Sequence, residues 1–250
     1  GAEVLTLTGT VYDSVTNSTA VSTTVTFNDL TAPSISAALA VNATNTSATI
    51  TFSEAVFKSD GSTRLTATEL VPTIASGTAT LTSYTVSTTD DTTFTFALTL
   101  SGTSDGAEVL TLTGTVYDSV TNSTAVSTTV TFNDLTAPTA AITYSTTSPY
   151  NNTETVTIIA TFNEAMADAA GVKIALSGAA TLTATAMTKE SATEYRYSYT
   201  VPAGNGTQTV ALSVGTDVAG NAITSAPSSG DTFVIDSTAP AAFTVAAVAT

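Results

Sequence analysis

The side chains of this 250-residue chain that could do chemistry are almost all carboxylates. The sequence holds 20 Asp and Glu residues against 5 Lys and Arg, and it contains neither His nor Cys. Without His, a Ser hydroxyl lacks its ordinary general base, and without Cys there is no thiol nucleophile. Zinc and the transition metals likewise lose their preferred nitrogen and sulfur ligands. No Gly-rich phosphate loop is present, so we expect no catalytic residue and no site for an organic cofactor.

Paired carboxylates are the remaining catalytic option, because two of them suffice for glycoside hydrolysis. The candidate pairs are Asp90 with Asp91 and Glu190 with Glu194. Both pairs lie in segments with the composition of turns or strands, so solvated charge is the better interpretation. We therefore expect that the protein is not an enzyme.

A second set of carboxylates and amides recurs at fixed places along the chain. Carboxylate, amide and backbone oxygens are calcium ligands, and extracellular modules bind this ion with a Kd of roughly 10⁻⁴–10⁻³ M. The alternative is that these Asp and Asn residues only form turns. The candidate calcium ligands are Asp29, Glu54, Asp118 and Asn122 in one group, and Asp134, Glu164, Asp217 and Asn221 in the other.

The charge balance limits the possible partners. A formal net charge of −15 repels nucleic acids and anionic membrane surfaces, since phosphate binding needs clustered Lys and Arg. No apolar run approaches the roughly 18 residues of a membrane span, so we expect no membrane insertion in this segment. The same acidic balance suits hard cations.

The chain contains an internal repeat, which fixes its layout. Residues 1–33 recur without a change as residues 106–138. A third, diverged copy keeps the order of three short motifs. Residues 133–138, 51–56 and 118–122 (NDLTAP, TFSEAV and DSVTN) reappear as residues 235–240, 161–166 and 217–221 (IDSTAP, TFNEAM and DVAGN).

The Thr-Ala-Pro tripeptides that end each copy predict the domain boundaries. Proline breaks strand pairing and holds the preceding residue extended, which makes a short, stiff joint at Pro33, Pro138 and Pro240. We expect whole domains at 34–135 and 139–237. Residues 1–30 would then be the last two strands of a preceding domain, and 241–250 the first strand of a following one.

Alternating apolar residues predict the fold of each domain. Phe94, Phe96 and Leu98, for example, alternate with small or hydroxylated residues. About seven such runs in 100 residues, joined by Gly, Asn, Asp and Ser turns, are typical of an immunoglobulin-like sandwich of two sheets. The chain is therefore expected to be all-β, with tandem sandwiches. A β-helix has a much shorter period, and a barrel would not explain tandem joints.

This strand order explains why the candidate ligands would meet. The first strand runs away from the Pro joint and the second returns, which places Glu54 back at the joint. The sixth strand also returns, so Asp118 and Asn122 lie at the same pole. Asp29 ends the preceding repeat at the joint itself.

The motifs resemble those of the bacterial Ig-like repeats of giant surface adhesins and biofilm-associated proteins. The resemblance rests on Asp-x-Thr-Ala-Pro, Thr-Phe-Ser-Glu-Ala-Val and Asp-x-Ala-Gly-Asn occurring in order, and it covers both whole domains and the partial ends. It implies an extracellular stalk on the bacterial cell surface, often rigidified by calcium. The chain departs from the pattern at Thr121, where the family has Gly and where Gly220 stands in the last copy; this predicts a weaker calcium site beside Thr121.

The expected function is that of a non-catalytic structural region of a surface fibre. Its partners would be neighbouring repeats of the same chain and other copies of the fibre. The alternative is a self-assembling subunit of an extracellular filament, sheath or surface layer, held by lateral contacts between chains. The low content of charged residues, 10%, favours that alternative somewhat, because such surfaces pack against copies of themselves.

Overall fold

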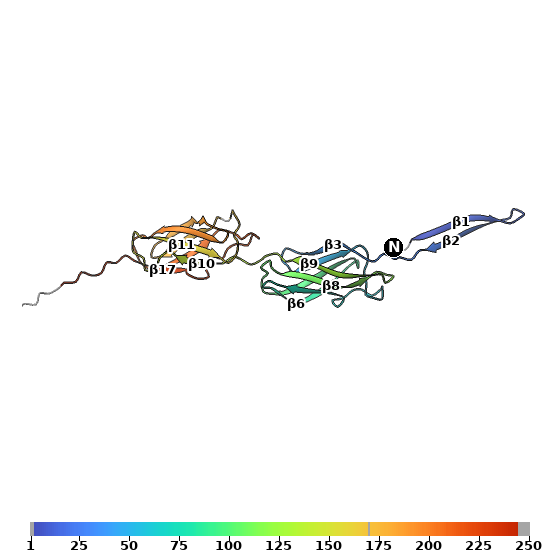
Figure 1. Ribbon diagram of the computed structural model, residues 1–250, viewed down its shortest axis with the longest axis horizontal. Helices are drawn as coiled ribbons and strands as arrows, with labels where there is room; N and C mark the ends of the chain where they lie inside the picture. Colours follow the sequence, from blue (N-terminus) through green and yellow to red (C-terminus); the bar gives the residue numbers. More distant parts are fainter. Residues whose placement is uncertain (1–2, 170, 245–250) are drawn as a thin grey trace, which may run out of the picture. The chain divides into compact units, whose positions relative to one another are not determined.

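The computed structural model describes residues 3–169 and 171–244, and it divides the chain into two compact units, Gly1–Asn133 and Asp134–Thr250 (Figure 1). All regular structure in the described residues is β-strand, in antiparallel sheets. The predicted all-β sandwich fold is confirmed. The proposed first strand of a following domain, 241–250, falls mostly on residues outside the described ones.

Unit 1 contains a complete sandwich of seven strands. Its two sheets have the orders β3-β4-β7-β6 and β5-β8-β9. In chain order these are strands A-B-E-D and C-F-G, which is the arrangement of a constant-type immunoglobulin domain. The strands are β3 (Ile35–Val41), β4 (Ser47–Phe52), β5 (Leu70–Ala75), β6 (Thr80–Ser87), β7 (Thr93–Ser101), β8 (Val109–Tyr117) and β9 (Ser123–Thr131).

The core of unit 1 lies between these two sheets. Phe94, Phe96 and Leu98 alternate into it from β7, as their period of two requires. Phe52 from β4 meets Phe94 edge to face, with ring centroids 6.0 Å apart. Leu110 and other apolar residues of β8 close the core from the opposite sheet.

Unit 2 repeats the plan with one extra strand. Its sheets have the orders β10-β11-β15-β14 and β13-β12-β16-β17. An aromatic group at one end of its core includes Tyr150 and Phe233, whose ring centroids are 5.5 Å apart. The strands are β10 (Ala140–Tyr144), β11 (Thr155–Phe162), β12 (Lys173–Gly178), β13 (Leu182–Ala186), β14 (Thr188–Lys189), β15 (Glu194–Thr200), β16 (Asn205–Ser213) and β17 (Thr232–Asp236).

Strands β1 (Val4–Tyr12) and β2 (Ser18–Thr26) form a separate two-stranded sheet. Their sequence is identical to that of β8 and β9, and so is their pairing register. Val4 pairs with Thr26 in the first hairpin, as Val109 pairs with Thr131 in the second. The register is therefore encoded within the hairpin itself.

Candidate metal centre

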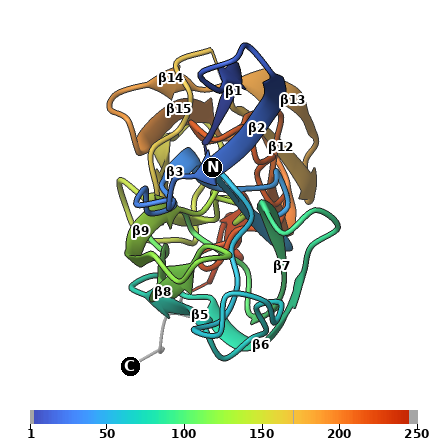
Figure 2. The same ribbon diagram turned by 90° about the vertical axis from the view of Figure 1, so that its right-hand side faces the viewer.

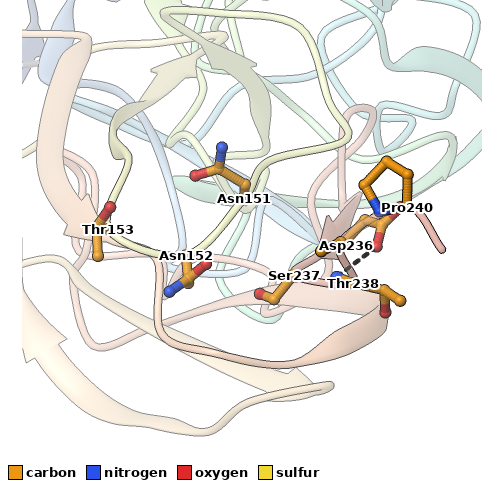
Figure 3. A pocket seen from close by; sticks show the side chains of 8 residues that line it. Asn151, Asn152, Thr153, Asp236, Ser237, Thr238 and Pro240 are labelled. Atoms are coloured by element: carbon orange, nitrogen blue, oxygen red, sulfur yellow. Dashed lines mark hydrogen bonds between the residues drawn. The ribbon is translucent and has the colours of Figure 1, made fainter. Parts of the chain in front are cut away.

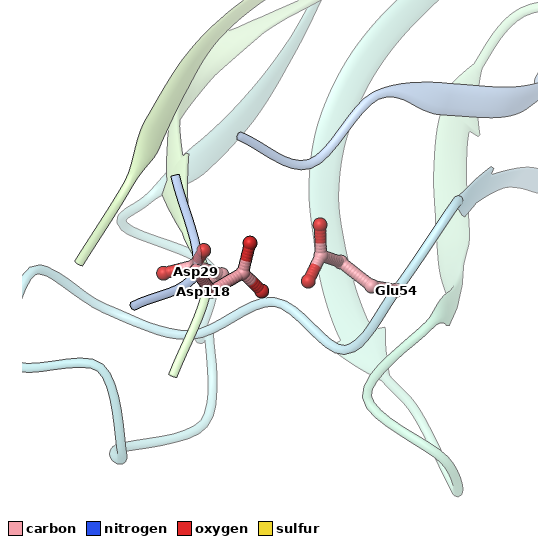
Figure 4. A group of neighbouring side chains, drawn as sticks. All are labelled: Asp29, Glu54 and Asp118. Carbon is pink, nitrogen blue, oxygen red and sulfur yellow. The ribbon is translucent and has the colours of Figure 1, made fainter. Parts of the chain in front are cut away.

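In unit 1, three of the predicted ligands come together. Asp29 follows β2, Glu54 follows β4 and Asp118 follows β8. One carboxylate oxygen of each lies within 4.8 Å of one of each of the others, and Figure 4 shows the three carboxyl groups facing a common space. Asp118 is buried and the other two are partly buried.

Unit 2 brings the equivalent three residues together in the same way. Asp134 precedes β10, Glu164 follows β11 and Asp217 follows β16. Their carboxylate oxygens also lie within 4.8 Å of one another, and Asp217 is the buried member. The two sandwiches, although their sequences have diverged, thus each contain the same arrangement of three acidic groups.

The loop after β8 fixes the buried carboxylate of unit 1. Asp118 Oδ1 accepts hydrogen bonds from the backbone N–H of Val120 at 2.9 Å and of Asn122 at 2.8 Å. Asp118 Oδ2 accepts from the Asn122 side-chain amide at 2.7 Å. Asp118 and Asn122 therefore form a turn, as the alternative interpretation of the sequence expected, and Asp118 also belongs to the group of carboxylates.

The side-chain amides of Asn122 and Asn221 lie beside the acidic clusters and donate hydrogen bonds to them; the role of these two residues as calcium ligands stays a prediction. The Asn122 amide nitrogen also donates to the backbone carbonyl of Asp29 at 3.1 Å. In unit 2, the Asn221 amide donates to Asp217 Oδ2 at 2.8 Å and to the backbone carbonyl of Asp134 at 3.2 Å. Each amide nitrogen thus ties the incoming segment to the loop and orients two of the acidic residues.

Burial and mutual repulsion raise the pKa of the Glu residue in each cluster. The pKa of Glu54 is raised by burial and then by the charges of Asp118 and Asp29. The pKa of Glu164 is raised by burial and then by Asp134 and Asp217. A nearby cation would reverse this effect, because an opposite charge favours the ionised form.

One loop position, Thr121 in unit 1 and Gly220 in unit 2, has an unusual backbone conformation. Thr121 has φ of +72°, and its counterpart Gly220 has φ of +101°. A β-branched residue in this left-handed region costs roughly 1–3 kcal/mol, whereas Gly adopts it freely. The tighter binding expected at the site beside Gly220 stays a prediction.

The carboxylate pairs considered for hydrolysis have structural partners. Asp90 Oδ1 accepts from the backbone N–H of Thr93 at 2.9 Å and from that of Thr92 at 3.0 Å, and these bonds lower the pKa of Asp90 to about 2. Asp91 forms an ion pair with Arg64 at 3.1 Å.

Glu194 belongs to the second of those pairs and is likewise engaged. Its Oε1 lies 2.7 Å from an Arg196 guanidinium nitrogen, in an ion pair on the same strand. The carboxylate therefore balances a neighbouring charge.

One depression in unit 2 is lined mostly by polar residues, with Ala239 and Pro240 beside them (Figure 3). Its only carboxylate is Asp236, whose Oδ1 accepts from the Thr238 backbone N–H at 3.0 Å. Asp236 stands where Asp29 and Asp134 stand in their copies. A single carboxylate does not form the grouping seen at the two clusters.

The sequence reasoning missed a buried acid. Glu108 is fully buried at the start of the hairpin that continues into β8. Its Oε1 accepts from the backbone N–H of Thr78 at 2.9 Å and of Ala79 at 2.7 Å, and its Oε2 accepts from Asp105 N–H at 3.2 Å. Gln208, also fully buried, occupies the equivalent place in unit 2. The signal available was an acid and an amide at matching positions of two repeats.

Comparisons with known proteins leave the family open. No family model matches the chain, and no curated protein matches it. FdeC, an adhesin of Escherichia coli, is similar with a TM-score of 0.41 and 15% identity, over 86% of this chain and 68% of that one. Dimeric latent PorU of Porphyromonas gingivalis is similar with a TM-score of 0.28 and 16% identity, over 83% of this chain and 20% of that one. Likenesses of this size assign neither a family nor an activity.

Within the described residues, no helix is long and apolar enough to cross a membrane.

Proposed function

We propose that this chain is a non-catalytic structural repeat region of an extracellular bacterial surface fibre or adhesin, stiffened by calcium. The observation that carries the proposal is the recurrence of one three-carboxylate cluster in two sandwiches. Each cluster combines two residues of the sandwich with one residue of the segment that leads into it. A bound cation would therefore fasten that segment to the sandwich.

Hydrogen bonds support the same role at the junction between the units. Asn133, the last residue of unit 1, donates its backbone N–H to Asn45 Oδ1 at 3.0 Å, and its carbonyl accepts from the Asn45 amide at 2.7 Å. Asp134, the first residue of unit 2, is held through its carbonyl by Asn221. Asn133 is thus held within unit 1, and Asp134 is held within unit 2.

Calcium suits the clusters better than other common ions. Three carboxylates with no nitrogen or sulfur ligand favour a hard cation, and calcium is a hard cation that takes carboxylate oxygens in a flexible geometry. A divalent ion would offset most of the charge of three close carboxylates in a chain whose net charge is −15.

The test is solution scattering on the whole chain in calcium and in chelator. We expect a narrower distribution of end-to-end distances in calcium, because the ion binds only the fastened arrangement of the leading segment. A Glu54→Gln/Glu164→Gln variant is the matched control and should scatter alike in both conditions. Equal flexibility of the wild type in both conditions would remove calcium from the proposal and leave the hydrogen bonds as the stiffening element.

A specific surface favours the alternative of a laterally assembled filament or layer. The outer face of the β5-β8-β9 sheet carries no charged side chain, although the chain is strongly acidic. Charge repulsion would not oppose the packing of this face on a second copy. Electron microscopy of the secreted material distinguishes the two functions, as single threads or as an ordered lattice. The outer face consists of Val71, Thr73, Ala75, Val109, Thr111, Thr113, Thr115, Tyr117, Ser123, Ala125, Ser127, Thr129 and Thr131.

A further inference from the structure

Backbone hydrogen bonds join the first segment of unit 2 (residues 138–150) to its last segment (residues 224–236). The two segments run in the same direction, and Ala141 is bridged to Ser229 and Tyr150 to Ile235 in parallel. The bonds, each from a backbone N–H to a carbonyl, run from Thr224 to Pro138 at 3.2 Å, from Ser228 to Ala140 at 2.8 Å, from Ile142 to Ser229 at 2.9 Å, from Tyr150 to Val234 at 2.9 Å and from Asp236 to Tyr150 at 2.9 Å.

This parallel arrangement resists tension that is applied through the chain. Tension pulls the first segment of unit 2 toward residue 134 and the last segment toward residue 237, so the two segments slide lengthwise against each other. Bonds that are spread along a shared length are then loaded together, and they must break together. Forced unfolding is governed by the rate of unfolding, which this barrier sets.

Unit 1 connects its first and last strands differently. Strand β3 lies beside strand β9 (Figure 2), but in the part of the chain that the structure describes no backbone hydrogen bond joins the two strands. Side chains make the connections instead. At one end of β9 the Thr124 hydroxyl donates to the carbonyl of Pro33, and beyond the other end Asn133 is held by Asn45.

Asn45 makes the more extensive of these two connections. It is fully buried in the turn that follows β3. Asn45 Oδ1 accepts from the Asn133 backbone N–H at 3.0 Å and from the Asn133 side-chain amide at 3.0 Å, and Asn45 Nδ2 donates to the Asn133 carbonyl at 2.7 Å. Load that enters along β3 therefore crosses to the outgoing chain through one side chain.

We propose that tension unfolds unit 1 before unit 2, and that the Asn45 amide limits the force that unit 1 withstands. The bonds of Asn45 lie at one point and fail together with one side chain, whereas those of unit 2 are spread from Pro138 to Asp236. Unit 1 then releases residues 34–133, about 340 Å of extended chain, while unit 2 stays folded. The chain thus lengthens under load before its second sandwich fails, with or without calcium.

The first experiment stretches the whole chain by its two ends, in chelator, and records the length released at each unfolding event. The two sandwiches release similar lengths, so a disulfide is used to mark one of them. Thr157 and Ser198 are directly paired on β11 and β15, at a distance that a disulfide spans, and the chain has no cysteine of its own. Thr157→Cys/Ser198→Cys shortens the release from unit 2 by about 140 Å.

We expect the unshortened release first, at the lower force, and the shortened release second. Thr49→Cys/Thr95→Cys, at a paired position of β4 and β7, marks unit 1 in the same way and should reverse the order of the two lengths. Hairpin β1–β2 releases less chain than either sandwich and is recognised by that. Unfolding of unit 2 first, or of both units at one force, would overturn the proposal.

The second experiment removes the Asn45 amide. Asn45→Ala should speed the unfolding of unit 1 at constant force about tenfold and leave unit 2 unchanged. Thr44→Ala is the matched control, because Thr44 is exposed in the same turn and its hydroxyl is bonded to Asn42 and Thr46; it should change neither unit.

Glu108→Ala separates a role under load from a role in overall stability. Glu108 is also buried, but its partners Thr78 and Ala79 belong to neither the first nor the last strand of unit 1. This variant should lose stability in urea without the tenfold acceleration under force. Equal acceleration in Asn45→Ala and Glu108→Ala would overturn the role of Asn45.

A pair of variants in unit 2 tests the proposal even if Asn45→Ala does not fold. Asp236→Pro deletes the N–H that bonds to the Tyr150 carbonyl, whereas Asp236→Ala keeps that N–H and removes the same carboxylate. Asp236→Pro should lower the force at which unit 2 unfolds, and Asp236→Ala should not. Equal forces in these two variants would show that the parallel backbone bonds do not carry the load.

Discussion

Replacing Glu164 by Gln should stabilise unit 2 without metal and remove most of its response to calcium. The substitution keeps the size of the side chain and deletes one of three charges that lie within 4.8 Å of one another. Asp217→Ala would be a poorer choice. It also removes the acceptor for Gly220 N–H at 2.6 Å and for Asn221 N–H at 2.8 Å, and so disrupts the loop.

The magnitude follows from these distances. Two charges at that separation repel by about 3 kcal/mol at an effective dielectric constant of 20. Partial exposure of Glu164 reduces the effect to about 1 kcal/mol. In chelator, the variant should therefore melt about 4 °C higher than the wild type.

Calcium should reverse the order of stability. With a Kd of roughly 10⁻⁴–10⁻³ M, calcium at about 10 mM stabilises the wild-type unit by about 1.4–2.7 kcal/mol. The Glu164→Gln variant lacks one carboxylate ligand, so calcium should add little to its stability. The assay is thermal unfolding followed by circular dichroism, with and without calcium.

Glu190→Gln is the control, because Glu190 is an exposed acid of the same unit outside the cluster. It should shift neither the melting temperature in chelator nor the gain from calcium. The reasoning is refuted if Glu164→Gln fails to stabilise the metal-free unit, or if calcium raises its melting temperature as much as that of the wild type.

Three further predictions follow from the same contacts. Thr121→Gly should stabilise unit 1 by about 1 kcal/mol in urea unfolding because it relieves the positive φ, whereas Ser119→Gly, at a position without positive φ, should not. Glu108→Ala should destabilise unit 1 by about 3 kcal/mol in the same urea unfolding, since it leaves buried N–H groups without an acceptor. Glu108→Gln should destabilise unit 1 less, because Gln208 occupies that place in unit 2. Equal losses of stability in the two variants would contradict this role of Glu108. Without metal, the stability of unit 2 should fall as the pH rises from the ordinary Glu pKa of 4.5 through the raised pKa of Glu164. The reason is that the folded state keeps the Glu164 proton to a higher pH than the unfolded state does. A Glu164→Gln variant should lose this dependence of stability on pH.

The sequence alone determined the strands and the loops between them. The duplicated segment demonstrates this, since it forms the same register and the same Asp–Asn turn in β1–β2 and in β8–β9. Thr16 and Thr121 even share the same unusual φ, of +73° and +72°. These features depend on hydrogen bonds between residues a few positions apart, which an alternating pattern and turn residues encode directly.

The grouping of three carboxylates was predictable for a related reason. Once seven strands are arranged as an immunoglobulin-like sandwich, the topology fixes which loops share a pole. Glu54 and Asp118 follow strands that run toward the same end, so their proximity follows from strand direction alone.

Tertiary structure decided what each side chain does. Glu3 and Glu108 stand in identical sequences, yet Glu3 is exposed and Glu108 is buried. The difference arises because the partners of Glu108, Thr78 and Ala79, lie about 30 residues away in the loop before β6. Asn122 orients the acidic cluster through its amide because the carbonyl of Asp29, 93 residues earlier, lies within reach. Burial and long-range hydrogen bonds depend on which distant surface covers a segment, and a local sequence does not specify that surface.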